Sequence, residues 1–318
     1  RPTVSTALNG RTAVSPRTRA RVESVIQDYG YQPRPTTARP AAQLIELVFH
    51  ELESPWAVEL LRGVEAAASA EGVGVVVSDL ATAHTPSAAW MDAMLARRPA
   101  ALVLVLVELS ADQRARLASR NLPYVMVEPV NEVDSSVPTV GSSNWLGGRA
   151  ATMHLIELGH RRIGVIGGPL STQSSRIRVD GYRDALLTSG IAVDPELITH
   201  GDFHVNSGYE LGHHLLTLPH PPTASFAGSD LQAMGVLRAA RELNIAVPEQ
   251  LSVVGYDDLP MAAWLTPALT TVHQPLFEMA ETAAHIALQL ARGQEPPARR
   301  LDLSVGLVIR QSTAPAVS

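Results

Sequence analysis

The stretch SDLQAMGVLRAARELNIAVPEQLSVVGYDD, residues 229–258, contains the two elements from which the fold is built. Residues 231–243 have the spacing of an amphipathic helix, and residues 251–255 form a short, valine-containing apolar run. A helix followed by a buried strand is part of a βαβ unit, in which parallel strands alternate with covering helices. The stretch therefore predicts a parallel sheet with helices packed on it.

The same alternation occupies the chain from residue 42 onward, in two consecutive sets of four units. We predict strands over 44–49, 73–78, 101–107 and 124–127, then over 163–166, 197–200, 224–227 and 251–255. The helices are expected over 56–71, 86–97, 111–121, 145–158, 178–189, 207–216 and 231–243. Two such sets predict an α/β protein of two doubly wound lobes. Ligands of these sheets bind beyond the carboxyl ends of the strands, so two facing lobes enclose a cleft.

The domain organisation follows from the segments at the two ends of the chain. A helical stretch at 276–292 and a strand at 303–309 have to be shared between the lobes, so the chain crosses between them more than once. We expect a first lobe of 44–160 with 275–303, and a second of 161–274 with 304–318. Residues 33–43, PRPTTARPAAQ, contain three prolines and predict a linker, which leaves residues 1–32 as a separate head.

Charge is divided unequally between the head and the body. Residues 1–40 carry seven arginines against Glu23 and Asp28, whereas the remainder carries eighteen arginines against twenty-nine acids. A basic head on an acidic body favours binding of a polyanion, with a solvated basic tail as the alternative. No cysteine, no signal-like apolar stretch at the start and no apolar run long enough for a bilayer occur, so we expect a cytoplasmic protein without a membrane partner.

The head contains TVSTALNG (3–10) and VSPRTRARVESVIQDYGYQP (14–33), where Ser15 and Pro16 are typical of a helix start. Both stretches closely resemble the helix-turn-helix head of the lactose-repressor and galactose-repressor (LacI/GalR) family. The resemblance implies operator DNA as a partner, with the recognition helix in the major groove. The positions that it assigns to DNA contact are Arg1, Ser5, Thr6, Asn9, Ser15 and Thr18.

This head departs from the family pattern in three ways. The chain opens inside the recognition helix, so we expect a partial helix-turn-helix that binds operator weakly or not at all, or a helical remnant that contacts no nucleic acid. Thr6 stands where the family usually has arginine. The linker has Ala38-Arg39-Pro40-Ala41 in place of the leucine-bearing hinge helix that the family inserts into the minor groove.

The resemblance extends through the body. SPWAVELLRGVEAAA (54–68), LGHRRIGVIGGP (158–169), residues 229–258 and TPALTTVHQP (266–275) match family blocks in order. It implies a periplasmic-binding-protein-like core, a ligand-responsive repressor and a homodimer. Since no heptad tail follows Ile309, we expect no larger assembly.

Four residues of the body are assigned to effector binding by this resemblance. Trp56 and Phe203 are aromatic positions at the cleft, where a ring can stack on a pyranose. Arg178 matches the family's effector-binding arginine, whose planar fork suits two neighbouring hydroxyls, and Asp257 matches its ligand-accepting aspartate. Ordinary packing is the alternative for the aromatics.

Four weaker candidates accompany them. Trp264 precedes the last family block, and Asp230 either caps the following helix or reaches the ligand. Asn144 and Gln274 fall at expected interlobe crossings. For Arg178, the alternative is a surface salt bridge with Asp180 or Asp184.

The expected effector is a mono- or disaccharide, with no other cofactor. Adjacent histidines such as His213 and His214 do not share a helix face, so no metal site is expected. The chain has no G-x-S-x-G elbow or Walker loop, and the neighbouring acids Asp257 and Asp258 do not suit glycosidase geometry, so no enzyme is expected. The rival hypothesis is a periplasmic-type sugar-binding protein of a transport system, which shares the two-lobed architecture.

Overall fold

The structure is a computed structural model that describes residues 44–317. The head and linker lie outside the described residues, and with them the DNA-contact positions Arg1, Ser5, Thr6, Asn9, Ser15 and Thr18. Within the described range, no helix combines the length and the apolar character needed to cross a membrane.

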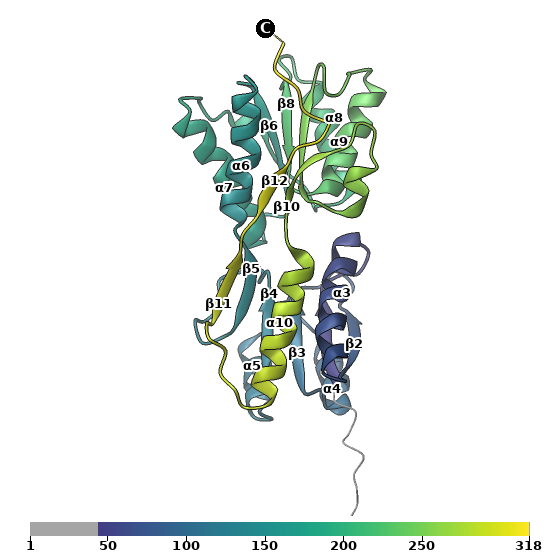
Figure 1. The fold of residues 1–318 in the computed structure, drawn as a ribbon, viewed down its shortest axis with the longest axis vertical. Coiled ribbons are helices and arrows are strands. Elements are labelled where there is room, and N and C mark those ends of the chain that lie inside the picture. Colours follow the sequence, from purple (N-terminus) through teal and green to yellow (C-terminus); the bar gives the residue numbers. More distant parts are fainter. Residues whose placement is uncertain (1–43, 318) are drawn as a thin grey trace, which may run out of the picture. The chain divides into compact units, whose positions relative to one another are not determined.

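Two six-stranded sheets organise residues 44–317 (Figure 1). The first has the order β11-β5-β4-β3-β1-β2, with β1 Leu44–Phe49, β2 Gly74–Asp79, β3 Ala101–Val105, β4 Tyr124–Val127, β5 Thr139–Ser142 and β11 Arg300–Leu303. The second has the order β12-β10-β9-β8-β6-β7, with β6 Ile163–Gly167, β7 Ile198–His200, β8 Ala224–Ala227, β9 Ser252–Asp257, β10 Thr270–His273 and β12 Gly306–Val308. Only the β10–β12 pair is antiparallel among these strands.

Helices cover both faces of each sheet. On the first, α3 (Pro55–Ala70) and α10 (Leu276–Ala291) share one apolar cluster with the strands, and α4 (Ala88–Arg97) and α5 (Ala111–Ala118) share another. On the second, α6 (Asn144–Glu157) and α7 (Gln173–Thr188) cover one face, while α8 (Val205–Leu216) and α9 (Asp230–Glu242) cover the other. Two short 3₁₀ turns, η1 (Pro195–Leu197) and η2 (Pro260–Ala263), complete the elements. The predicted doubly wound α/β class is therefore confirmed.

Local sequence explains why these elements form. The β3 strand, ALVLV, is buried along its whole length, as a strand covered on both faces must be. Ser54, Ser87, Ser110 and Ser229 accept hydrogen bonds from the first-turn N–H groups of α3, α4, α5 and α9, which satisfies donors that have no partner within the helix.

Three segments carry the chain from one sheet to the other: β5 to α6, β10 to α10, and β11 to β12. The single strand predicted at 303–309 is in fact two short strands, one in each sheet. Helix α6 packs on α7 and the second sheet, although the boundary predicted at 160 assigned it to the first lobe. We propose that the first crossing lies at Ser143, directly after β5.

Candidate functional site

A cavity lies beyond the carboxyl ends of strands from both sheets. The volume enclosed by the cavity is about 90 Å³, and the space between its lining atoms, with the open mouth and its solvent included, is about 690 Å³. The lining residues from the first lobe are His50, Glu51, Ser54, Trp56, His84, Leu106 and Glu128. Those from the second lobe are Pro169, Thr172, Ser174, Arg178, Asp202, Phe203, His204, Ser229, Leu231 and Asp257.

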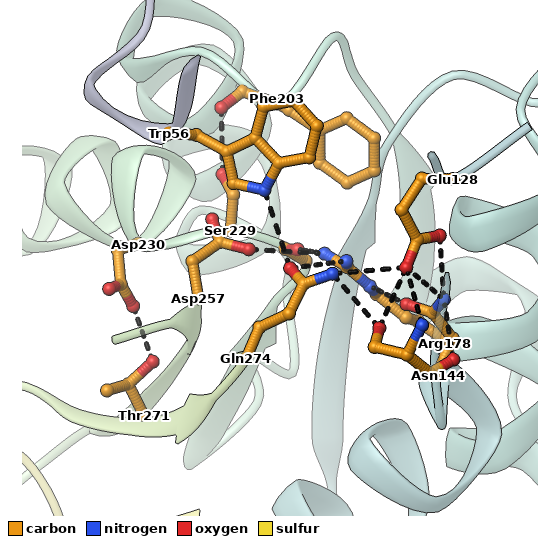
Figure 2. Close-up of polar contacts among 12 residues, drawn as sticks. Trp56, Glu128, Asn144, Arg178, Phe203, Ser229, Asp230, Asp257, Thr271 and Gln274 are labelled. Atoms are coloured by element: carbon orange, nitrogen blue, oxygen red, sulfur yellow. Dashed lines mark hydrogen bonds and ion pairs between the residues drawn. The ribbon is translucent and has the colours of Figure 1, made fainter. Parts of the chain in front are cut away.

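Arg178 lies at the centre of the site, in the second turn of α7 (Figure 2). The predicted helix began at 178, but α7 begins at Gln173, because polar residues buried near the cavity form its first turn. The guanidinium carbon lies 3.6 Å from the centroid of the Tyr256 ring and 5.5 Å from that of Phe203. These rings confine the guanidinium by cation–π contact and packing.

Hydrogen bonds fix the orientation of this guanidinium. Nε donates to Asn144 Oδ1 at 2.8 Å, Nη1 donates to the Gly228 carbonyl at 2.6 Å, and Nη2 donates to Gln274 Oε1 at 3.3 Å. An arginine has five N–H groups, so three bonds leave two N–H groups for a ligand.

The alternative of a surface salt bridge for Arg178 does not occur. Asp180 pairs with Arg183, and Asp184 pairs with Arg149. Arg178 itself is only 5% exposed, and it faces the cavity.

Asp257 is the acid nearest to Arg178, with 3.7 Å between Oδ1 and Nη1. It ends β9 at φ 111°, a conformation that L-residues rarely adopt and that accompanies functional positions. Burial raises the pKa of the Asp257 carboxyl well above its usual value, and the charge of Arg178 opposes this rise. The pair therefore places an oxygen and N–H groups side by side at the cavity wall.

The two aromatic candidates both line the cavity. Trp56 lies in the first turn of α3 and donates its indole N–H to Gln274 Oε1 at 3.4 Å. Phe203 has φ 71°, and its carbonyl accepts a hydrogen bond from Ser229 Oγ. A Cβ on Gly168 would lie 2.1 Å from the Phe203 ring, so only glycine permits this ring position.

Asn144 and Gln274 lie behind Arg178 and do not line the cavity. Gln274 Nε2 donates to Glu128 Oε1 at 3.2 Å and to Ser142 Oγ at 3.0 Å. Asn144 Nδ2 donates to both oxygens of Glu128. The two amides therefore connect Arg178 to the crossing segments at β5 and β10 and position its side chain (Figure 2).

Two other candidates lie outside the cavity lining. Asp230 is fully buried and accepts hydrogen bonds from Thr271 Oγ1 and the Leu259 N–H. One expectation was that Asp230 caps the following helix, but the N-cap of α9 is Ser229. Burial raises the pKa of Asp230 to about 7. Trp264 follows η2 and is 79% exposed.

Six titratable residues that line the cavity were not predicted as ligand contacts from the sequence: His50, Glu51, His84, Glu128, Asp202 and His204. Glu128 is the first polar residue after β4, and His50 is the first after β1. The rule that drew attention to Asp257, a polar side chain directly after a buried strand, was available for both. Within residues 44–317, no group of three or more potential ligand side chains is arranged to hold a metal ion.

Comparison with known proteins places this architecture in a class. Residues 152–313 match the model of the periplasmic binding protein-like domain. The solved complex of the transcriptional regulator CelR with cellobiose is 32% identical, with a TM-score of 0.76, over 98% of this chain and 95% of that one. The lac repressor dimer bound to operator and the anti-inducer ONPF is 28% identical, with a TM-score of 0.74 and the same coverage. The fold and the site thus define a two-lobed, ligand-responsive regulator.

Curated relatives identify the family. The chain is 33% identical over 314 residues to the HTH-type transcriptional repressor CytR of Escherichia coli K12, covering 98% of this chain and 92% of CytR. It is 33% identical over 318 residues to the repressor PurR of Yersinia pestis strain Pestoides F, covering 98% and 93%. The chain belongs to the LacI family of transcriptional repressors. The resemblance is confirmed. These relatives support a ligand-responsive repressor and not the rival hypothesis, a sugar-binding protein of a transport system.

Proposed function

We propose that the effector of this repressor is a mono- or disaccharide held in the cavity between the lobes. The observation that carries the proposal is the pairing of Arg178 with Asp257 at the cavity wall, with the guanidinium packed against the rings of Phe203 and Tyr256. CelR, a relative at 32% identity, has been solved with cellobiose.

Each of four residues has a stated role in this proposal. The two N–H groups of Arg178 that remain free donate to neighbouring hydroxyls, and Asp257 accepts from the same part of the sugar. Trp56 and Phe203 cover the apolar faces of a sugar ring. Asn144 and Gln274 keep Arg178 in place. Asp230 and Trp264 have no contact with the effector in this arrangement, because neither lines the cavity.

The proposed mechanism links the cavity to operator DNA through a homodimer in the cytoplasm. The effector stabilises one relative position of the lobes, and operator stabilises another, so that each ligand weakens the binding of the other by the same factor. Two heads of one dimer read two half-sites with a fixed spacing. Sedimentation should give a mass of about twice 34.0 kDa.

We further propose that the chain binds its sugar without hydrolysing it. A glycosidase needs two carboxyl groups on opposite sides of the scissile bond. Of the two acids considered for this role, Asp257 lines the cavity, whereas Asp258 is engaged with Arg310 and His273 and is not among the lining residues.

A thermal-shift screen tests the effector assignment. Mono- and disaccharides, nucleobases and nucleosides are compared at matched concentrations, and a saccharide should raise the melting temperature in a concentration-dependent way. Stabilisation by nucleobases or nucleosides with no response to any saccharide contradicts the proposal.

A further inference from the structure

The first-lobe wall of the cavity carries two stacked imidazoles. His50 and His84 follow the neighbouring strands β1 and β2, and their ring centroids are 4.8 Å apart with an interplanar angle of 8°. Both rings line the cavity. Two parallel rings this close do not both carry a positive charge, because a pair of imidazolium groups would repel each other.

Hydrogen bonding determines which ring atoms are acceptors. His84 Nδ1 lies 2.8 Å from the Leu106 carbonyl, which can only accept, so Nδ1 carries the proton and Nε2 of the neutral ring is an acceptor. Burial, with His84 and His204 nearby, lowers the pKa of His50 to about 4, so His50 is neutral at pH 7. Its Nε2 faces Glu51, and its Nδ1 has no hydrogen-bond partner among the described residues.

Carboxylates complete this wall. Glu51 Oε1 lies 2.9 Å from His204 Nε2, a contact between the loop after β1 and the loop after β7. Besides Asp257, the partner of Arg178, the acids Glu51, Glu128 and Asp202 line the cavity, and Arg178 is the single guanidinium among its described lining residues. The hydrogen-bond donors to the Glu128 carboxylate are all neutral groups, so Arg178 forms no ion pair with it.

We propose that His50, Glu51 and His84, with His204 facing Glu51, make this cavity selective for an uncharged, hydroxyl-rich effector and exclude phosphorylated and carboxylated sugars. Hydroxyl groups donate to the imidazole and carboxylate acceptors of the wall, whereas a phosphate or a carboxylate on the ligand faces like charge and lone pairs. The inference rests on the proposed saccharide function and adds the charge class of the ligand.

Calorimetry on the full chain tests the selectivity. The probes are the neutral saccharide that stabilises the chain most in the screen, its 6-phosphate and its uronic acid. Because burying like charges against one another costs several kcal/mol, we expect at least roughly hundredfold weaker binding of both anionic probes. Equal or tighter binding of an anionic probe overturns this inference and leaves the saccharide assignment standing. A screen in which no saccharide binds overturns the assignment, and the inference with it.

A substitution pair assigns the effect to the wall. Glu51→Gln removes one charge at almost constant volume and releases His204 as a partner for an anion. We expect the preference for the neutral sugar over its 6-phosphate to fall about tenfold, mainly through tighter binding of the phosphate. The matched control is Glu53→Gln, an exposed acid of the same loop outside the cavity lining, which should leave the preference unchanged. A preference that Glu51→Gln does not alter overturns the role of this wall.

Discussion

Arg178 is held by contacts from four separate parts of the chain. Asn144 belongs to α6, Gly228 follows β8, Tyr256 lies in β9, and Gln274 follows β10. Each contact removes freedom from the side chain before a ligand arrives, so little entropy remains to be lost on binding. Two N–H groups are nevertheless left without a protein acceptor, which is why this buried cation is suited to a ligand.

Arg178→Ala tests that role. We expect effector affinity to fall by at least roughly thirtyfold, because truncating one partner of a buried charge pair costs about 2–5 kcal/mol and leaves Asp257 without its cation. The measurement is calorimetric titration of the folded variant. Arg176→Ala is the control, since Arg176 bonds to the Leu170 carbonyl and to Asn131 at the surface. Equal affinities in the two variants would show that the cavity has been misassigned.

Asp230 provides a prediction about pH. Burial raises its pKa from 3.8 to about 7 in the folded protein, so the unfolded chain releases this proton first as the pH rises. The free energy of unfolding should therefore decrease between about pH 4 and pH 7, by an amount on the order of a few kcal/mol. Asp230→Asn should show a smaller decrease over this range, measured by urea denaturation at fixed pH values. Parallel pH profiles of the two proteins contradict the prediction.

Periodicity predicted the long elements because their burial is continuous or regular. β1, β4 and β8 lie where the apolar runs placed them, α9 differs from expectation by one residue at each end, and α10 differs by one residue at its C-terminal end only. The pattern did not reveal β5 (TVGS), β10 (TTVH) or β11 (RLDL). These strands are short and contain threonine, glycine or charged residues, so none of them forms an apolar run. Their strand character comes from pairing with neighbours distant in sequence.

The residues of the site likewise divide into those that the sequence predicts and those that depend on contacts between distant parts of the chain. Arg178 and Asp257 could be expected from the family resemblance, and the structure brings them together. The contact between Glu51 and His204 joins residues 153 positions apart, and no local pattern contains that proximity. The positions of Asn144 and Gln274 behind Arg178 likewise follow from how the crossings pack.

The contact between α3 and α10 depends on one glycine. A Cβ on Gly63 would lie 2.2 Å from the Phe277 carbonyl oxygen, which belongs to the backbone and cannot rotate away. Gly63→Ala should therefore separate the two helices and lower the free energy of unfolding by about 1–3 kcal/mol, despite the better helix propensity of alanine. Chemical denaturation measures the change. Glu65→Ala, at an exposed position of the same helix, should change stability by less than about 0.5 kcal/mol, and an equal effect of both variants contradicts the packing argument.

At the scale of the whole molecule, the three crossings are where effector binding can affect the position of the lobes. Gln274 lies in the β10 to α10 crossing. It contacts Ser142 at the end of β5, directly before the β5 to α6 crossing. The same side chain accepts from Arg178 and from Trp56. One amide therefore connects two crossings with two of the proposed effector contacts.

Gln274→Leu separates a coupling role from a purely structural one. Leucine keeps most of the volume but leaves the Arg178 and Trp56 donors and the Glu128 acceptor without this partner, at about 1–3 kcal/mol for a buried unsatisfied group. We expect effector affinity to fall roughly tenfold. We also expect the change in radius of gyration that the effector causes at saturation, measured by small-angle X-ray scattering, to be smaller than in the parent. Gln294→Leu, at an exposed position, is the control. If Gln274 only supports the fold, its variant will lose stability, but the effector will change the radius of gyration at saturation as much as in the parent. Ligand binding would then move the lobes without the hydrogen bonds of the Gln274 amide.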